Sequence, residues 1–155
     1  MFPHVDDKGY CGFELKNKNF TSFAKGGEKG LWLSAGDFET DNRWVFCESD
    51  VEALSYAQLF DDHNTRYASR GGEINPCQPG LIKWFALSFL PHTEIIAAMN
   101  NDDAGEHLTE EVGKAIAATR RSDLQFGIHL PDCRGEDWND VLAKHSFHHC
   151  RGLFE

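Results

Sequence analysis

Short apolar runs alternate with longer segments of helical periodicity from residue 44 onward. Each run has the length of a buried strand, and each following segment repeats its apolar residues at a spacing that puts them on one helical face. The expected strands are 44–47, 67–69, 94–99 and 126–130, and the expected helices are 50–60, 79–89, 103–119 and 138–146. This alternation is typical of an α/β fold, with a mostly parallel sheet covered by helices on both faces.

The first 35 residues have a different pattern. Two turn signals, residues 6–9 and 25–30, separate aromatic-rich runs of strand length. These runs predict an antiparallel hairpin or meander that extends the sheet. The expected organisation is therefore an N-terminal β extension (1–35), an α/β domain (44–146) and a polar C-terminal tail (147–155), packed as one compact unit.

Acidic and amide side chains follow three of the predicted strands. Glu48 follows the first strand, Asn100 and Asp102 follow the third, and Asp137 comes soon after the fourth. Because the carboxyl ends of parallel strands line one crevice of a Rossmann-like sheet, we expect these side chains to converge there. Like charges at close range are costly unless a cation lies between them. Oxygen ligands of this kind suit magnesium, with manganese as a substitute.

Four neighbouring side chains could support this metal site from further out: Glu52, Asp103, Asn139 and Asp140. Each acidic position also has a structural interpretation. Asp102 or Asp103 could cap the helix that follows, Asp137 could cap the last helix, and Glu48 or Glu52 could be a solvated surface charge.

The charge of the chain limits how it could bind nucleic acid. Its formal net charge is −10, and the excess of acidic residues lies after residue 35. A protein that binds phosphates normally carries a basic surface, so phosphate-binding groups should be few and local. Arg66 and Arg70 border a short strand before Gly71-Gly72, and Lys83 lies on the next helix. We predict phosphate contacts by these three residues, with a plain turn and solvated arginines as the alternative.

Cellular location follows from two further observations. No apolar run approaches the roughly 20 residues that cross a bilayer, and the N-terminus does not have the pattern of a signal peptide. The five cysteines are an odd number without a Cys-x-x-Cys pair, which favours reduced thiols. The expected protein is soluble and cytoplasmic, without membrane contact.

Three motifs, in this order, resemble those of the TOPRIM domain. Val45-Phe46-Cys47-Glu48-Ser49 resembles its first motif, in which a glutamate ends a hydrophobic strand. Asn100-Asn101-Asp102-Asp103-Ala104-Gly105 resembles its Asp-x-Asp motif with the trailing Ala-Gly, and Glu136-Asp137-Trp138-Asn139-Asp140 resembles its late acidic motif. The resemblance covers residues 44–145. Residues 1–35, with the run 20–32 inside them, resemble the segment before TOPRIM domains in plasmid and mobile-element proteins of the primase-like or relaxase-associated type.

The resemblance implies a magnesium-dependent nucleotidyltransferase or nuclease that acts on nucleic-acid phosphodiesters, DNA more than RNA. By this resemblance Glu48 and Asp102 are catalytic, and Glu48, Asn100, Asp102 and Asp137 hold the metal. Position 100 departs from the family pattern, because asparagine replaces an aspartate. The alternative is a catalytically impaired module of the same fold that binds metal, nucleic acid or a partner protein. Other domains of a longer polypeptide are further expected partners.

Overall fold

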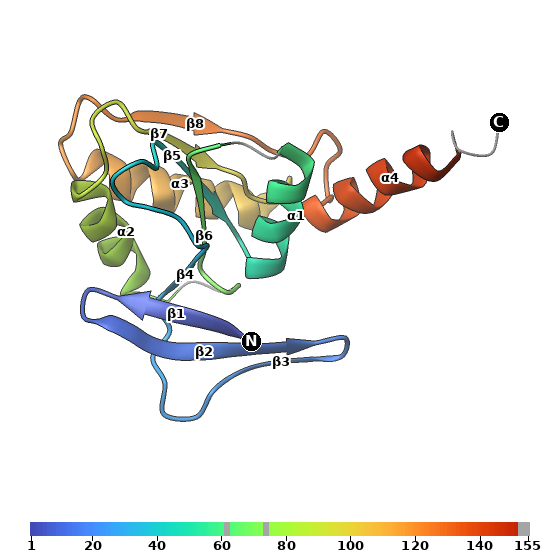
Figure 1. The fold of residues 1–155 in the computed structure, drawn as a ribbon, viewed down its shortest axis with the longest axis horizontal. Helices are drawn as coiled ribbons and strands as arrows, with labels where there is room; N and C mark the ends of the chain where they lie inside the picture. The colour runs from blue at the N-terminus through green and yellow to red at the C-terminus, as the bar shows by residue number, and fades with distance from the viewer. Residues whose placement is uncertain (61–62, 73–74, 152–155) are drawn as a thin grey trace.

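The computed structural model describes residues 1–60, 63–72 and 75–151, with side chains up to residue 146. It contains one sheet with helices on both faces (Figure 1). The elements in chain order are β1 (Phe2–Asp6), β2 (Gly9–Asn17), β3 (Phe20–Phe23), β4 (Leu31–Leu33), β5 (Arg43–Cys47), α1 (Asp50–Phe60), β6 (Thr65–Ser69), α2 (Gln78–Leu87), β7 (Glu94–Ala97), α3 (Asp103–Ala117), β8 (Gln125–Ile128) and α4 (Trp138–Arg151).

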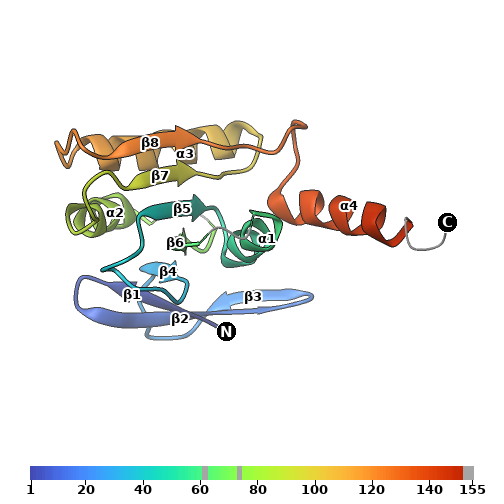
Figure 2. The ribbon, with the colours of Figure 1, turned by 45° about the horizontal axis from the view of Figure 1, so that its top comes forward.

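The strands form an eight-stranded sheet in the order β3-β2-β1-β4-β6-β5-β7-β8 (Figure 2). The last four strands of this order are mutually parallel, as expected for the α/β part. The first four pair antiparallel, and β4 joins the two halves by pairing antiparallel with β6. The predicted antiparallel β extension is therefore confirmed. The prediction of a mostly parallel sheet is wrong for the whole sheet, because the N-terminal strands continue it through β4.

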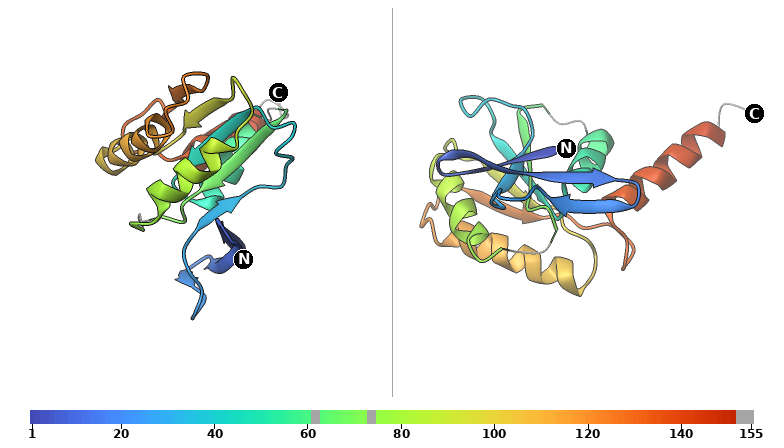
Figure 3. Two further views of the ribbon diagram at one scale, coloured as in Figure 1. Left: turned by 90° about the vertical axis from the view of Figure 1, so that its left-hand side faces the viewer. Right: turned by 90° about the horizontal axis from the view of Figure 1, so that it is seen from below.

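Strand β5 shows why the parallel half forms at this place in the sequence. Four consecutive residues, Trp44 to Cys47, are buried, as in a strand covered on both faces. Trp44 and Phe46 belong to one apolar cluster with side chains of α2 and α3, whereas Val45 and Cys47 belong to a second with α1 and α4. The helices therefore cover the two faces in pairs. Figure 3 shows α2 beside α3, with the N-terminal strands at the far end of the sheet from β8.

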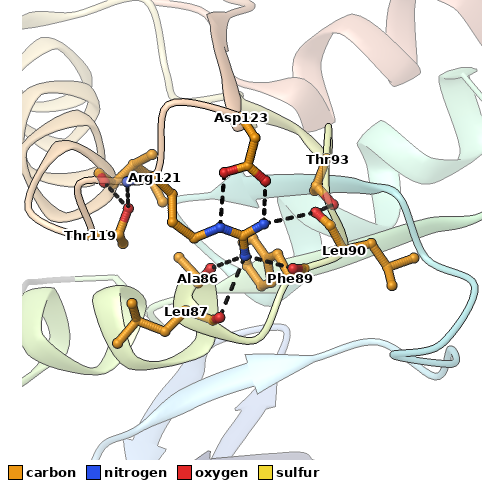
Figure 4. A network of polar contacts seen from close by, with 9 residues as sticks. Ala86, Leu87, Phe89, Leu90, Thr93, Thr119, Arg121 and Asp123 are labelled. Carbon is orange, nitrogen blue, oxygen red and sulfur yellow. Dashed lines mark hydrogen bonds and ion pairs between the residues drawn. The ribbon is translucent and has the colours of Figure 1, made fainter.

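Arg121, in the connection from α3 to β8, fixes the end of α2. Its guanidinium donates to the backbone carbonyls of Ala86, Leu87, Phe89 and Leu90, and it forms an ion pair with Asp123 (Figure 4). A cation at this position complements the carbonyl groups exposed at the end of a helix. The contact holds the end of α2 against the loop that leads into β8.

Two sequence expectations concern the ends and the surroundings of the chain. The expected tail, 147–155, overlaps the end of α4, and its last four residues lie outside the described part. In the described ranges, none of the helices is long and apolar enough to span a membrane.

Candidate functional site

The candidate site lies where the parallel strands β6, β5, β7 and β8 end; we call this the carboxyl edge. Glu48 follows β5, which lies between β6 and β7, so Glu48 is flanked by the residues that end both neighbours. On one side, the Asn100 amide Nδ2 donates to Glu48 Oε2 over 3.1 Å. On the other side, the Gly72 backbone N–H donates to the Glu48 carbonyl over 3.0 Å. Glu48 is therefore at the centre of the edge.

The loop that carries the late acidic motif approaches the loop after β7. The Asn101 N–H donates to the Glu136 carbonyl over 3.2 Å, and the Gly135 N–H donates to the Asn101 carbonyl over 2.7 Å. Trp138 anchors the start of α4, because its buried indole Nε1 donates to the Ala98 carbonyl over 3.0 Å. These contacts bring Asp137 to the same edge as Glu48.

Asp102 and Asp137 each cap a helix. One oxygen of Asp102 accepts the Gly105 N–H at the start of α3, and one oxygen of Asp137 accepts the Asp140 N–H at the start of α4, both over 2.8 Å. The alternative interpretation of these aspartates as caps is confirmed for both. A cap uses one carboxylate oxygen. The negative charge of each aspartate still acts on the site, because both raise the pKa of Glu48.

The carboxylates of the site repel one another in a partly desolvated place. Burial is the main cause that raises the pKa of Glu48, and Asp102 and Asp137 raise it further, whereas Arg70 lowers it. Burial also raises the pKa of Glu52 to about 7; its hydrogen bonds to Ser49 lower this pKa, and the charges of Glu48 and Asp137 raise it. Such mutual repulsion is relieved when a cation binds between the carboxylates.

Arg70, directly after β6, supplies positive charge beside Glu48. Its side chain is fully buried, and burial lowers its pKa to about 10, against the opposing effect of the Glu48 charge. Its guanidinium nitrogens have no hydrogen-bond partner within residues 1–60, 63–72 and 75–146. A buried cation of this kind is suited to an anionic ligand.

The other predicted site residues lie elsewhere or serve a local role. Arg66 is near the opposite end of β6, where it pairs with Asp41 over 2.8 Å and lies over the Phe38 ring at 4.2 Å. Lys83 is exposed on α2. Asp103 is exposed and pairs with Arg134. The remaining two residues belong to α4: Asn139 accepts from the Ser55 hydroxyl over 2.7 Å, and Asp140 is exposed.

Two further residues, Gly105 and Ser49, shape the edge; both lie within the sequence motifs, but no role was predicted for either. A β-carbon at Gly105 would lie 2.0 Å from the Asn100 carbonyl oxygen, so only glycine lets α3 begin this close to the loop. The Ser49 hydroxyl accepts the Glu52 N–H over 3.4 Å at the start of α1. A glycine in the first turn of a helix was the available signal for the first, because glycine is unfavourable within helices.

The donor set fits a divalent cation with a preference for oxygen. The Asn100 amide oxygen is buried and has no hydrogen-bond partner among the described residues, and the same is true of one Glu52 oxygen. Together with Glu48 and the aspartates, these atoms offer carboxylate and amide oxygens. Magnesium is bound by one or two carboxylates and otherwise retains water or substrate oxygens. The residues at the carboxyl edge therefore fit magnesium.

Glu52 gives a pH-dependent stability to the metal-free protein. Because its pKa is raised from 4.5 to about 7 on folding, the folded state holds a proton that the unfolded state releases, so stability falls as pH rises from 4.5 through 7. At about 1.4 kcal/mol per pKa unit, the loss is about 3 kcal/mol by pH 8. We expect the free energy of unfolding of Glu52→Gln to fall less than that of the wild type between pH 4.5 and 8. The measurement is urea unfolding with chelator present. Glu110→Gln, at an exposed position, is the control, and equal pH profiles for wild type and Glu52→Gln would contradict the assignment.

Comparison with known proteins gives one match. The sequence profile of the family described as Toprim-like matches residues 45–142, which is more than half of the chain. The matched range begins in β5 and ends in α4, so it contains all four parallel strands and the carboxyl edge. No significant match was found among curated proteins or among solved structures.

Proposed function

Because this chain belongs to the Toprim-like family, we propose that it is a magnesium-dependent module that acts on nucleic-acid phosphodiesters. Domains of this family bind magnesium and act on nucleic acids, and no finer activity follows from membership alone. The finer proposal is primase-like nucleotidyl transfer or strand cleavage in the processing of plasmid or mobile-element DNA. It is supported by the resemblance of residues 1–35, with the run 20–32, to the segment that precedes such domains.

The proposal is supported by the hydrogen bond from Asn100 to Glu48 and by the charges of Asp102 and Asp137, which both act on Glu48. In the proposed site these four side chains hold the ion. When bound, magnesium neutralises charge that develops on a phosphoryl group and orients the reacting oxygen.

Side chains of the protein are proposed to transfer the proton and to attract the phosphate. Glu48 has a raised pKa, which suits a group that accepts a proton from an attacking hydroxyl or donates one to a leaving oxygen. Arg70 has no hydrogen-bond partner within the described residues, and its buried charge beside Glu48 is the proposed electrostatic attraction for a phosphate. Of the other two predicted phosphate-binding residues, Arg66 is already paired with Asp41, and Lys83 is proposed to contact a phosphate only at the periphery of the site. With a net charge of −10, binding should be weak and strongly salt-dependent.

A second candidate function is a module of the same fold that binds metal, nucleic acid or a partner without catalysis. Asn100 favours this alternative, because it contributes no charge to the ion and donates its N–H to Glu48, the carboxylate that would otherwise face the ion. One experiment separates the two candidates. The protein is titrated with magnesium by calorimetry and is then assayed for primer synthesis and for nicking of supercoiled DNA. Metal-dependent activity supports the enzyme, and metal binding without activity supports the binding module.

Asn100→Asp tests how much the missing charge matters. A unit charge at about 4 Å is worth about 4 kcal/mol at an effective dielectric constant near 20, before repulsion among the carboxylates is subtracted. We therefore expect magnesium affinity to rise on the order of tenfold, with a parallel rise in any activity. The control is Asn101→Asp, which adds the same charge at the neighbouring position, where the side chain donates to the Pro131 carbonyl. Equal magnesium affinities for wild type and Asn100→Asp would count against this metal site.

A further inference from the structure

A second cluster of metal-binding side chains lies apart from the carboxyl edge and joins the N-terminal strands to α1. It consists of His4 from β1, Glu14 from β2 and Asp50, the first residue of α1. All three are buried, with 0%, 4% and 0% of their surfaces exposed. Each offers one ligand atom, and these atoms lie within 4.8 Å of one another.

The His4 ring is oriented as metal-binding histidines are. Its Nδ1 lies 2.9 Å from the Gly30 carbonyl oxygen, and because a carbonyl can only accept, Nδ1 carries the proton. In the neutral ring with its proton on Nδ1, Nε2 has a free lone pair. Nε2 is buried and has no hydrogen-bond partner among the described residues. A backbone carbonyl that holds the other ring nitrogen is the usual support of a metal-bound histidine.

The two carboxylates direct further acceptor atoms toward this lone pair. Glu14 Oε2 and Asp50 Oδ2 are buried without a hydrogen bond inside the described ranges, while the other Asp50 oxygen accepts from the Ser69 hydroxyl. A β-carbon placed on Gly71 would lie 3.1 Å from Glu14 Oε2 and 3.3 Å from His4 Nε2. Both atoms therefore border the same small space, which glycine leaves open. Acceptor atoms this close together are unfavourable unless a cation lies among them or beside them.

Lys16 offsets only part of this charge. Its ammonium lies 3.1 Å from Glu14 Oε2 and 3.7 Å from Asp50 Oδ2, as ion pairs outside hydrogen-bond geometry. One ammonium faces two carboxylates. The Lys16 side chain is 17% exposed at the rim, and its flexible stem can carry the ammonium into solvent when another cation enters.

We propose that His4, Glu14 and Asp50 form a second metal site, which takes a first-row transition ion such as zinc. One imidazole and two carboxylates suit zinc, whereas magnesium selects oxygen alone. Tetrahedral ligands at about 2.1 Å from zinc are about 3.4 Å apart, so side-chain movements of up to about 1.4 Å would close the cluster, whose ligand atoms lie within 4.8 Å of one another, around the ion. The ion links β1 and β2 to α1, the helix that starts two residues after Glu48. This site does not depend on the function proposed above.

Zinc binding is measured by competition with a chromophoric chelator, with millimolar magnesium present to occupy the carboxyl edge. We expect one tight equivalent of zinc, and a rise in melting temperature of about 5 °C or more at a hundredfold excess over Kd. His4→Gln and Glu14→Gln should each weaken zinc binding at least tenfold. His107→Gln, at an exposed position in α3, should leave it unchanged.

Two further measurements separate a metal site from an ion pair that Lys16 already balances. Glu14→Gln relieves repulsion, so it should stabilise the metal-free protein even as it weakens zinc binding. Lys16→Met removes the competing cation, so it should tighten zinc binding. A cobalt-loaded sample should lack the near-ultraviolet absorption of thiolate ligands. The proposal is overturned if the wild type binds no zinc, if both His4→Gln and Glu14→Gln retain wild-type affinity, or if cobalt shows thiolate bands.

Discussion

Glu48→Gln is expected to reduce magnesium-dependent activity on nucleic acid by roughly 10²–10⁴-fold, the range that a general acid or base contributes. The amide cannot exchange a proton at the reacting oxygen. The substitution also removes one negative charge from the side chains that are proposed to hold the ion. The fold should persist. Glu48 is half-buried with a raised pKa, so loss of its charge relieves repulsion from Asp102 and Asp137.

The comparison needs a control for charge and a control for folding. Glu110→Gln removes one charge at an exposed position of α3, where the side chain pairs with Lys114, and should keep full activity. Thermal unfolding checks that both variants fold. If Glu48→Gln is as active as wild type in primer synthesis and in nicking, Glu48 is not the reacting acid or base.

Gly105→Ala is expected to have the second-largest effect, on stability and on metal binding together. The added β-carbon would lie 2.0 Å from the Asn100 carbonyl oxygen, and close to the Asn100 backbone nitrogen as well. Backbone cannot move aside as a flexible side chain can, so α3 and the loop after β7 must separate. Overpacking of this kind costs about 1–3 kcal/mol, and here it also displaces Asn100 and Asp102 from Glu48.

Gly80→Ala in α2 is the matched control, because its β-carbon would meet no atom within 4 Å. Alanine is the better helix former, so this variant should be more stable than wild type by about 0.5–1 kcal/mol. Urea unfolding and magnesium titration of both variants test the close approach. If Gly105→Ala is as stable as Gly80→Ala and binds magnesium normally, the close approach does not fix the loop.

The sequence predicts those parts of the fold that depend on local pattern. Four apolar runs indicated the four parallel strands, because strands buried on both faces are almost continuously apolar, as β5 is. The pairing of β4 with β6 carries no such local signal, since three residues of β4 can pair with any open strand edge. That single pairing joins the N-terminal strands to the sheet and makes the sheet mixed.

Positions at the ends of elements were harder to predict. Strand β6 starts at Thr65, two residues earlier than the apolar run suggested, so Arg66 lies within the strand and Arg70 directly after it. Of the two, Arg70 is the one whose charge lowers the pKa of Glu48. The cluster of His4, Glu14 and Asp50 joins two paired strands, β1 and β2, to the first residue of α1, which lies far from them in the sequence, so no local pattern indicates it.

The most direct test of the carboxyl-edge site is anomalous diffraction from crystals soaked in manganese, which substitutes for magnesium at oxygen ligands. The account predicts an anomalous peak within coordination distance of Glu48 and Asn100, with Asp102 or Asp137 as the next ligand or joined to the ion through water. A peak at His4, Glu14 and Asp50 alone would support the second site and contradict the first. No peak at the carboxyl edge of an intact fold, at manganese concentrations that saturate other sites, would contradict the central claim.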